Sequence, residues 1–362
     1  MLLLRVGVLV AVLGLFAGCG EAVRSGAQAP GGGVPASRAV PPSRDALPPT
    51  GCGPKIANPV AAQQALNNAR PGALICLSGP ALASAHLQVM RGGVPGAPVQ
   101  LLSDGATVLG IDVRADQVVV AGFTVREGGG ITLNGTGLRA HDNNVLNATM
   151  SGISCECTDT VIESNVVDGT DGTGIRVEGD RITVRDNEVS GSVRREASDA
   201  DGMRFFGTAI RITGNTVRDI SEKGYPPDEA PHTDCFQTYD SDAPPTYDVV
   251  ISDNRCERVD VQCLIATGER GNPGVPNGVR SIIFRDNFCN VGGSQAVLLE
   301  NYPHADVRGN TIMGPNLYRG VYISSGSKDT VVADNVLRGD SDVLESDEQS
   351  EPVAASNNRN QP

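Results

Sequence analysis

Ile182-Thr-Val-Arg-Asp-Asn187-Glu-Val189 is the stretch that decides the fold, because its pattern returns along most of the chain. Apolar residues alternate, Asp or Gly follows, and then comes Asn and a second short apolar run. The repeated Asn positions are Asn165, Asn187, Asn215, Asn254, Asn287, Asn310 and Asn335. Alternation with a period of two is typical of β-strands. A repeat of about 20 to 25 residues predicts a solenoid whose coils bury their apolar side by stacking.

A second series of short strands lies between these Asn positions. Its members begin at Gly130, Gly152, Gly174, Gly202, Cys235, Cys263, Ala296 and Gly320. Each repeat therefore carries at least two strands. A leucine-rich repeat has one strand per repeat and Leu at fixed offsets, whereas Val and Ile dominate here, which favours an all-β parallel β-helix. We expect each Asn to adopt the left-handed conformation of a sharp turn and to hydrogen-bond to the Asn of the next coil.

Insertions are concentrated around three adjacent repeats. The spacing from an Asn to the next strand start is 8 to 10 residues, except for 15 before Gly202 and 20 before Cys235. The spacing from a strand start to the next Asn is 13 to 15 residues, except for 19 after Cys235 and 24 after Cys263. Long loops on both sides of three neighbouring strands predict a cleft with those strands as its floor. The alternative is that a solenoid merely tolerates insertions at its surface turns.

Composition limits the possible partners. The chain has 362 residues, no Trp, 4% aromatic residues and a net charge of -13. A surface this acidic argues against general binding of nucleic acid or of anionic membranes, both of which require basic surfaces. An anionic polymer held in a locally basic cleft remains compatible with it. We expect a monomer and no nucleic-acid partner.

Residues 1–19 are predicted to be an export signal. Arg5 supplies the positive charge, and residues 6–15 form an apolar run too short to span a bilayer. The closing Leu15-Phe-Ala-Gly-Cys19 resembles the signal of bacterial lipoproteins, which implies a lipid on Cys19 and attachment to the membrane of the cell envelope. Plain secretion is the alternative. Residues 20–50 are rich in Pro, Gly, Ala and Ser and are predicted to be a flexible linker.

The predicted β-helix domain covers residues 51–339. A helix begins it, with Asn58 as the N-cap, Pro59 in the first helical position and Pro71-Gly72 after the end, and this helix would cover an exposed sheet edge. The first strand then runs over residues 74–77. After Gly339 the apolar rhythm stops, and residues 340–362 are predicted to be a disordered acidic tail.

Eight cysteines besides Cys19 are consistent with an oxidising compartment. Cys52 and Cys76 lie on either side of the predicted helix and are one disulfide candidate. Position in the repeat suggests two more, Cys235 with Cys263 and Cys256 with Cys289, with stacked free thiols as the alternative. The last two pairs would join equivalent positions of successive coils, which lie about 4.8 Å apart. Cys155 is interpreted as a small buried residue. No spacing of Cys and His indicates zinc.

The two-strand repeats, the Asn ladder and the helical cap resemble the pectate lyase-like superfamily over residues 52–339. That resemblance implies a right-handed parallel β-helix. Within it, His232-Thr-Asp-Cys-Phe, followed one repeat later by Val261-Gln-Cys-Leu, is similar in placement to the Asn-Thr-Asp-Gly and Asp-Asp-Cys motifs of polygalacturonases. Only Asp234 corresponds to a catalytic carboxylate of that family. Val261-Gln262 replaces its Asp pair, so hydrolysis by two carboxylates is not implied.

The predicted cleft still gathers many polar side chains. We expect the catalytic residues to be His232, Asp234, Lys223 and Arg204. We expect the substrate-binding residues to be Gln237, Tyr239, Asp201, Gln262 and Arg270. Lyases of this superfamily remove the proton next to a uronic carboxylate and often use Ca²⁺. The resemblance therefore also implies calcium candidates, namely Asp199, Asp201 and Asp234.

Two functions from different classes follow from these observations. The first is an exported, surface-anchored enzyme that acts as a lyase or hydrolase on an acidic polysaccharide. The clustered His, Lys, Arg and Asp residues favour it. The second is a glycan-binding or structural solenoid of the envelope without catalysis, which the missing second carboxylate favours. Asp201 and Asp234 would then only cap turns.

Overall fold

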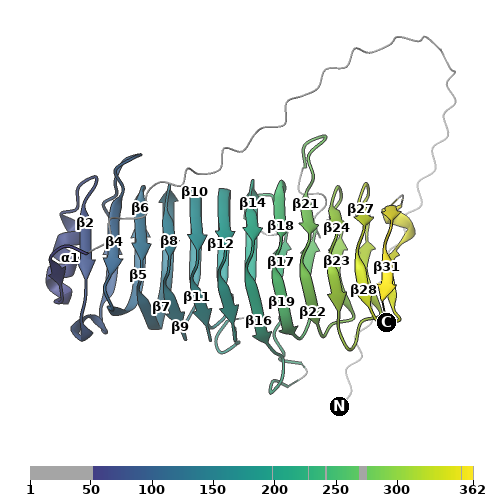
Figure 1. The fold of residues 1–362 in the computed structure, drawn as a ribbon, viewed down its shortest axis with the longest axis horizontal. Coiled ribbons are helices and arrows are strands. Elements are labelled where there is room, and N and C mark those ends of the chain that lie inside the picture. The colour runs from purple at the N-terminus through teal and green to yellow at the C-terminus, as the bar shows by residue number, and fades with distance from the viewer. Residues whose placement is uncertain are drawn as a thin grey trace, which may run out of the picture. The chain divides into compact units, whose positions relative to one another are not determined.

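The computed structural model describes residues 52–197, 199–226, 228–240, 243–268, 275–351 and 353–361, all within one compact unit. The predicted signal and linker, with Cys19, lie outside these ranges, and so does Arg270. Among the described residues, the pairings between the strands are parallel, and each strand pairs with its counterpart in the next coil. The prediction of an all-β parallel β-helix is therefore confirmed (Figure 1).

Each coil passes through three columns of strands. The first column includes the strands that the sequence predicts as the floor of a cleft. It contains β3 (His86–Val89), β5 (Thr107–Arg114), β7 (Thr124–Thr136), β10 (Ile153–Glu163), β12 (Ile175–Arg185), β14 (Met203–Thr208), β17 (Phe236–Tyr239), β20 (Leu264–Thr267), β23 (Gln295–Glu300), β26 (Arg319–Ser324) and β29 (Asp342–Ser346). β5 and β7 begin in the third column, and β10 and β12 continue into the second.

The second column leads to the Asn corner. It contains β1 (Lys55–Ile56), β2 (Leu74–Leu77), β4 (Val99–Ser103), β6 (Val118–Ala121), β8 (Arg139–His141), β15 (Arg211–Thr213), β18 (Val249–Ser252), β21 (Ile282–Arg285), β24 (Asp306–Arg308), β27 (Val331–Ala333) and β30 (Ala354–Ser356). The third column follows that corner with β9 (Asn144–Leu146), β11 (Val166–Asp168), β13 (Glu188–Ser190), β16 (Thr216–Ile220), β19 (Arg255–Val259), β22 (Phe288–Val291), β25 (Thr311–Met313), β28 (Val336–Arg338) and β31 (Arg359–Gln361).

The core is a stack of side chains from equivalent positions. In the first column the continuous row is Ile153, Ile175, Met203, Phe236, Leu264, Val297 and Val321, and each is at most 1% exposed. The row forms because alternate residues of a strand face the same side, and stacking is the only way for a coil to bury that side. Outward residues of the same strands remain available for a site.

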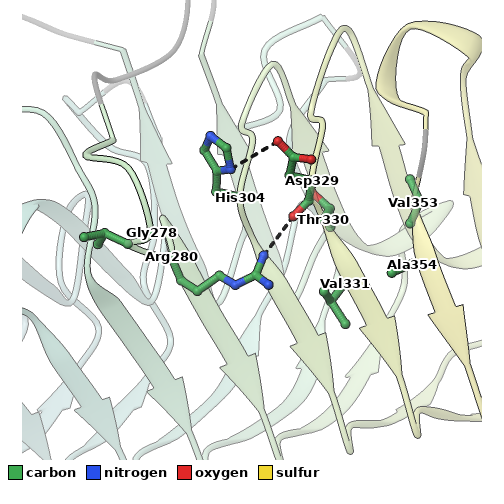
Figure 2. A pocket seen from close by; sticks show the side chains of 9 residues that line it. Gly278, Arg280, His304, Asp329, Thr330, Val331, Val353 and Ala354 are labelled. Atoms are coloured by element: carbon green, nitrogen blue, oxygen red, sulfur yellow. Dashed lines mark hydrogen bonds and ion pairs between the residues drawn. The ribbon is translucent and has the colours of Figure 1, made fainter. Parts of the chain in front are cut away.

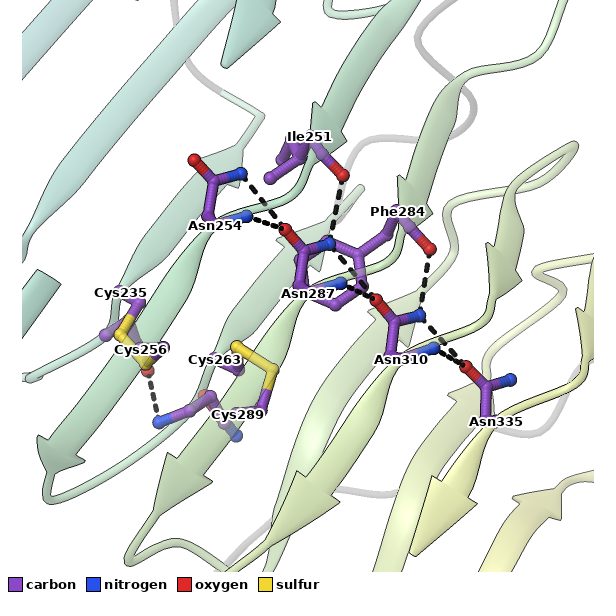
Figure 3. Close-up of a disulfide and its surroundings, with 12 residues drawn as sticks. Cys235, Ile251, Asn254, Cys256, Cys263, Phe284, Asn287, Cys289, Asn310 and Asn335 are labelled. Atoms are coloured by element: carbon purple, nitrogen blue, oxygen red, sulfur yellow. Dashed lines mark hydrogen bonds between the residues drawn. A yellow bond between two sulfur atoms is a disulfide. The ribbon is translucent and has the colours of Figure 1, made fainter. Parts of the chain in front are cut away.

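The Asn ladder runs from Asn143 to Asn358 (Figure 3). At Asn287, Oδ1 accepts hydrogen bonds from the backbone N and from Nδ2 of Asn254, both at 3.0 Å, and Nδ2 donates to Ile251 O. The expected ladder is confirmed. The expected left-handed Asn is wrong, because the preceding residue, such as Asp286 with φ 57°, takes that conformation. The Asn is thereby free to point inward.

The N-terminal helix α1 (Pro59–Asn67) is confirmed together with its cap. The Asn58 side chain accepts hydrogen bonds from the backbone N of Val60 at 2.9 Å and of Ala61 at 3.1 Å, and Leu66 packs into the core. Two short 3-10 helices also occur, η1 (Pro80–Leu82) and η2 (Glu348–Ser350). None of the helices in the described ranges is long and apolar enough to cross a membrane.

The predicted disordered tail is wrong for residues 340–361 as far as they are described. β29, β30 and β31 form one further coil, which pairs with β26, β27 and β28. Its acidic side chains face outward, while Val343 and Leu344 pack against the core. The ladder also continues into this coil, because Asn358 Oδ1 accepts a hydrogen bond from Asn335 Nδ2 at 3.0 Å. The many Asp and Glu residues of this segment led to the prediction of disorder, although its inward positions keep the apolar pattern of the repeat.

Apart from Cys52–Cys76, the disulfides lie within single coils rather than between them. The predicted pair Cys52–Cys76 is confirmed. The other two predicted pairs are wrong, because the observed bonds are Cys235–Cys256 and Cys263–Cys289 (Figure 3). Neighbouring positions on parallel strands point in the same direction, whereas inward residues of the first and third columns of one coil face each other. Cys155 is buried, as predicted, but it is bonded to Cys157.

Replacing Phe236 by Ala tests the stacked core. Its fully buried ring meets Phe284 with ring centroids 6.5 Å apart. We expect the substitution to lower the free energy of unfolding by about 3–5 kcal/mol, through lost burial and the cavity left behind. Tyr318→Ala is the control, because that exposed side chain should change stability by less than about 0.5 kcal/mol. Urea unfolding of both variants measures the difference, and equal losses would contradict a tightly packed stack.

Peptide mapping tests the disulfide pattern. After proteolysis without reduction, mass spectrometry should find Cys235 linked to Cys256 and Cys263 linked to Cys289. The reason is geometric, since these pairs have Cα–Cα distances of 6.1 and 5.8 Å across the interior of one coil. Linkage of Cys235 to Cys263 would contradict this arrangement of inward positions.

Candidate functional site

A cluster of charged residues lies at the entrance to β14 and β17, the two first-column strands preceded by the long insertions. Asp201 and Asp234 occupy equivalent positions just before these strands, and neither side chain is exposed to solvent. Asp201 Oδ1 accepts a hydrogen bond from the Asp234 backbone N at 3.1 Å, and Asp234 Oδ1 accepts one from the Gln262 backbone N at 2.9 Å. At another corner, these two carboxylates thus accept backbone amides between coils as the ladder asparagines do, but from the following coil instead of the preceding one.

Arg204 neutralises the first of the two carboxylates. Its Nε donates to Asp201 Oδ2 and its Nη2 donates to Asp199 Oδ2, both at 2.6 Å. Burial raises the pKa of Asp201 to about 7, although the nearby charge of Arg204 opposes that rise. The guanidinium is itself mostly buried, so its donors serve the protein rather than the solvent. Arg204 therefore fits a positioning role better than the catalytic role expected from the sequence.

His232 extends from the second carboxylate into solvent. Its Nδ1 lies 3.8 Å from Asp234 Oδ2, and 62% of the His232 side chain is exposed. The Asp234 carboxylate raises the pKa of His232 to about 9. Burial raises the pKa of Asp234, against the opposing effect of His232. The pair therefore combines a buried carboxyl with a cationic, accessible imidazole.

Three buried polar atoms around Asp234 lack hydrogen-bond partners among the described residues: Gln237 Oε1, Gln262 Oε1 and Thr233 Oγ1. Gln237 also sends Nε2 toward Asp234 Oδ2 at 3.5 Å. Buried polar atoms are normally satisfied. Both glutamines were expected to bind substrate, but the structure places them close beneath the surface. These three unpaired oxygens are more than the cluster would need if its only role were to hold the backbone turns.

An aromatic side chain forms the next part of the surface. Tyr239 is 37% exposed, and its ring packs edge-on against Phe206, with ring centroids 5.2 Å apart. The Arg204 guanidinium lies 5.7 Å from the Tyr239 ring centroid. Sequence reasoning missed Phe206. The available signal was a large aromatic at an outward position of β14, where a polar residue is usual.

The remaining loop residues divide into three cases. Lys223 is exposed, and its side chain makes no hydrogen bond or ion pair within the described ranges, while Arg270 lies outside them. Glu222 was missed by the sequence analysis. Burial raises its pKa, Asp260 adds to that rise, and the charge of His232 opposes it. The available signal for Glu222 was its place beside Lys223 in the long insertion.

The calcium expectation fits poorly with these contacts. Asp199 and Asp201 both bind Arg204, whose positive charge would repel a cation, and Asp201 Oδ1 already accepts a backbone hydrogen bond. In the part of the chain that the structure describes, no three His, Cys, Asp or Glu side chains are arranged to hold a metal ion. We therefore derive no step through Ca²⁺.

A polar hollow lies on the outward face of the first column, on the N-terminal side of the charged cluster. It has a volume of about 380 Å³, and its lining residues come from β5, β7 and β10: Asp112, Arg114, Thr132, Leu133, Asn134, Ser154 and Glu156. In the strand register, Asp112, Thr132 and Ser154 belong to the same outward row as Arg204 and Gln237. Polar groups thus continue along this face from the cluster.

The coils, the inward stack and the ladder define a right-handed parallel β-helix protein. The family model described as the right-handed β-helix region matches residues 129–337, more than half of the chain. The chain therefore belongs to that family. The resemblance to the pectate lyase-like superfamily is confirmed at the level of the fold. No curated protein matches the sequence.

Solved structures with the same fold include two mutants of the tailspike protein of E. coli bacteriophage HK620. Each is 10% identical, with 84% of this chain covering 62% of the tailspike chain; the TM-score is 0.56 for one and 0.51 for the other, which is in complex with a pentasaccharide. GH136 lacto-N-biosidase from Eubacterium ramulus is 11% identical with a TM-score of 0.53, and the match covers 83% of this chain and 64% of that enzyme. The chain thus spans less than two thirds of these proteins, and the likeness concerns the fold.

The pKa of His232 can be measured by NMR. We expect its ring protons to titrate near pH 9, and Asp234→Asn to bring the pKa back toward the ordinary value, because the carboxylate is the main cause of the rise. The raised pKa implies stabilisation that is fully present below about pH 6.5, the unfolded value. That stabilisation is lost as the pH rises through 9. An unchanged titration in Asp234→Asn would contradict the pairing.

Proposed function

We propose that the protein is an exported, carbohydrate-active β-helix protein that holds an acidic glycan over β14, β17 and β20 and cleaves it with His232 as the proton donor. The observation that carries this proposal is the pairing of exposed His232 with fully buried Asp234. A buried carboxylate that fixes and charges an accessible imidazole is an arrangement suited to general acid catalysis.

The chemistry follows from the accessibility of each group. Asp234 is enclosed, so substrate cannot reach it, and it acts as a positioning residue rather than as the catalytic carboxylate expected from the sequence. With a pKa of about 9, His232 carries a proton at neutral pH. It would give that proton to the glycosidic oxygen as the C–O bond breaks. Because its side chain is mostly exposed, water can then return the proton.

The second proton transfer requires a base. In hydrolysis the base takes a proton from water, and in elimination it takes the proton next to the uronic carboxylate. Glu222 is the candidate, since it is only partly buried and its charge interacts with that of His232. Lyase and hydrolase share the step assigned to His232. They differ in whether an unsaturated sugar or only a reducing end appears.

Several features support a glycan as the ligand. The exposed cations of His232 and Lys223 can attract a uronic carboxylate despite the acidic net charge. Tyr239 offers a ring against which a sugar can pack, and the polar hollow of β5, β7 and β10 lies on the same face. One of the tailspike structures that share the fold is in complex with a pentasaccharide, and another protein with the fold is a lacto-N-biosidase.

A second candidate function has its own supporting observation. Asp201 and Asp234 accept the backbone amides of the following coils, so both carboxylates have a structural task that needs no substrate. The protein would then be a non-catalytic solenoid that binds glycan or supports the cell envelope.

Export and anchoring belong to the proposal as well. The protein would be attached to the bacterial cell envelope through a lipid on Cys19, or else be secreted, and would work as a monomer. Four disulfides among the described residues support an oxidising compartment.

The test uses a panel of uronic-acid polymers, with ultraviolet absorbance for unsaturated products and a reducing-end assay for hydrolysis. We expect His232→Ala to lower kcat at least a hundredfold, the usual contribution of a general acid. Its stability should change by less than about 0.5 kcal/mol, because the side chain is largely exposed. His86→Ala, an exposed histidine of β3, is the matched control and should keep full activity.

Asp234→Asn keeps an acceptor for the Gln262 amide and should lower turnover while moving the pH optimum down. If His232→Ala retained the activity of the wild type, catalysis by His232 would be excluded. If the wild type bound a polymer but cleaved none of the panel, the non-catalytic solenoid would be the correct assignment.

A further inference from the structure

A separate cavity of about 480 Å³ lies on the second column, among the segments that lead into β21, β24, β27 and β30 (Figure 2). Successive coils supply Arg280, His304, Asp329 and Val353 to its wall. None of these residues belongs to the cluster around His232. The lining combines the Arg280 guanidinium, the His304 imidazole, the Asp329 carboxylate and partly buried apolar side chains. A few charged and polar groups beside an apolar surface are common in small-molecule sites.

Arg280 is held in place by the backbone. Its Nη1 donates to Asp329 O at 2.8 Å and to Ala305 O at 3.4 Å, so it bridges the two following coils. The other guanidinium nitrogens have no hydrogen-bond partner among the described residues. Figure 2 shows the guanidinium extended toward Thr330 and Val331, inside the cavity. The side chain is therefore fixed by one nitrogen, while the rest of its fork remains available.

Arg211 provides an internal comparison. It begins β15 in the second column, two coils before β21, the strand that follows Arg280. It also donates through Nη1 to the backbone O of an aspartate, Asp248, at 2.6 Å. Its Nη2 then donates to the carboxylate of the same Asp248 at 3.0 Å. At Arg280 that second contact does not form, because the Asp329 carboxylate faces His304, with Oδ2 3.5 Å from Nδ1. Two similar arginines thus differ in one respect, which is that Arg280 has no carboxylate partner.

We propose that this cavity binds the carboxylate of a uronic-acid sugar, with Arg280 as the anion-binding group. The free nitrogens of a guanidinium can bind both oxygens of a carboxylate, which is the contact that Arg211 makes in part with Asp248. Val279, Val331 and Val353 offer an apolar surface to the face of a pyranose ring. His304 contributes a second polar group, since only its Nδ1 faces Asp329. The site is independent of the proposed cleavage at His232.

Binding of monomeric glucuronate, followed by NMR titration of the whole protein at low salt, tests the proposal. We expect dissociation constants in the millimolar range, because one partly solvated ion pair supplies most of the affinity. Arg280→Gln should weaken binding at least tenfold. Arg211→Gln is the matched control and should bind glucuronate as the wild type does, because its guanidinium is already occupied. Thermal unfolding confirms that both variants are folded.

Further outcomes with other ligands and variants decide the matter. Glucose should not bind, since it lacks the carboxylate, and acetate should bind more weakly than glucuronate, since it lacks the ring. If acetate or inorganic phosphate bound as tightly as glucuronate, the sugar part of the proposal would be wrong. If Arg280→Gln bound glucuronate like the wild type, the proposal would be overturned. Loss of cleavage in His232→Ala with glucuronate binding intact would show that the two sites are separate.

Discussion

Satisfying the backbone amide at each corner of the coil is the constraint on which the rest of the structure depends. A parallel β-helix turns sharply three times per coil, and every buried N–H there must find an acceptor. At one corner the acceptor is an Asn side chain. Asn287 Oδ1 accepts the backbone amide of Asn254 in the preceding coil, and Asn287 Nδ2 donates to the carbonyl of Ile251. Each coil therefore depends on its neighbour for hydrogen bonds as well as for burial.

The candidate site uses the same solution with a charged residue. Asp201 and Asp234 each accept a backbone amide from the following coil, whereas a ladder Asn accepts one from the preceding coil, and a buried carboxylate is much more costly than a buried amide. Arg204 compensates the first, and His232 approaches the second. Where the chain has its long insertions, Asp instead of Asn accepts the backbone amide between coils. The buried carboxylate of Asp234 then keeps the exposed imidazole of His232 protonated.

The sequence predicted the features that depend on local periodicity. The inward row around Phe236 and the cap at Asn58 are confirmed, since each follows from residues close in sequence. The disulfide partners of Cys235 and Cys263 depend on which walls of a coil face each other, which spacing alone does not encode. The influence of His232 on the pKa of Glu222 likewise depends on the path of a long loop without a repeat.

Hydrogen–deuterium exchange with a bound glycan tests the central claim most directly, because it locates the ligand whether or not it is cleaved. The wild-type protein is compared with and without a polymer that it binds. The account predicts slower exchange in the two segments that hold the cluster, residues 199–204 and 232–239. Binding that leaves both segments unprotected while slowing exchange elsewhere would contradict the assignment of the glycan site.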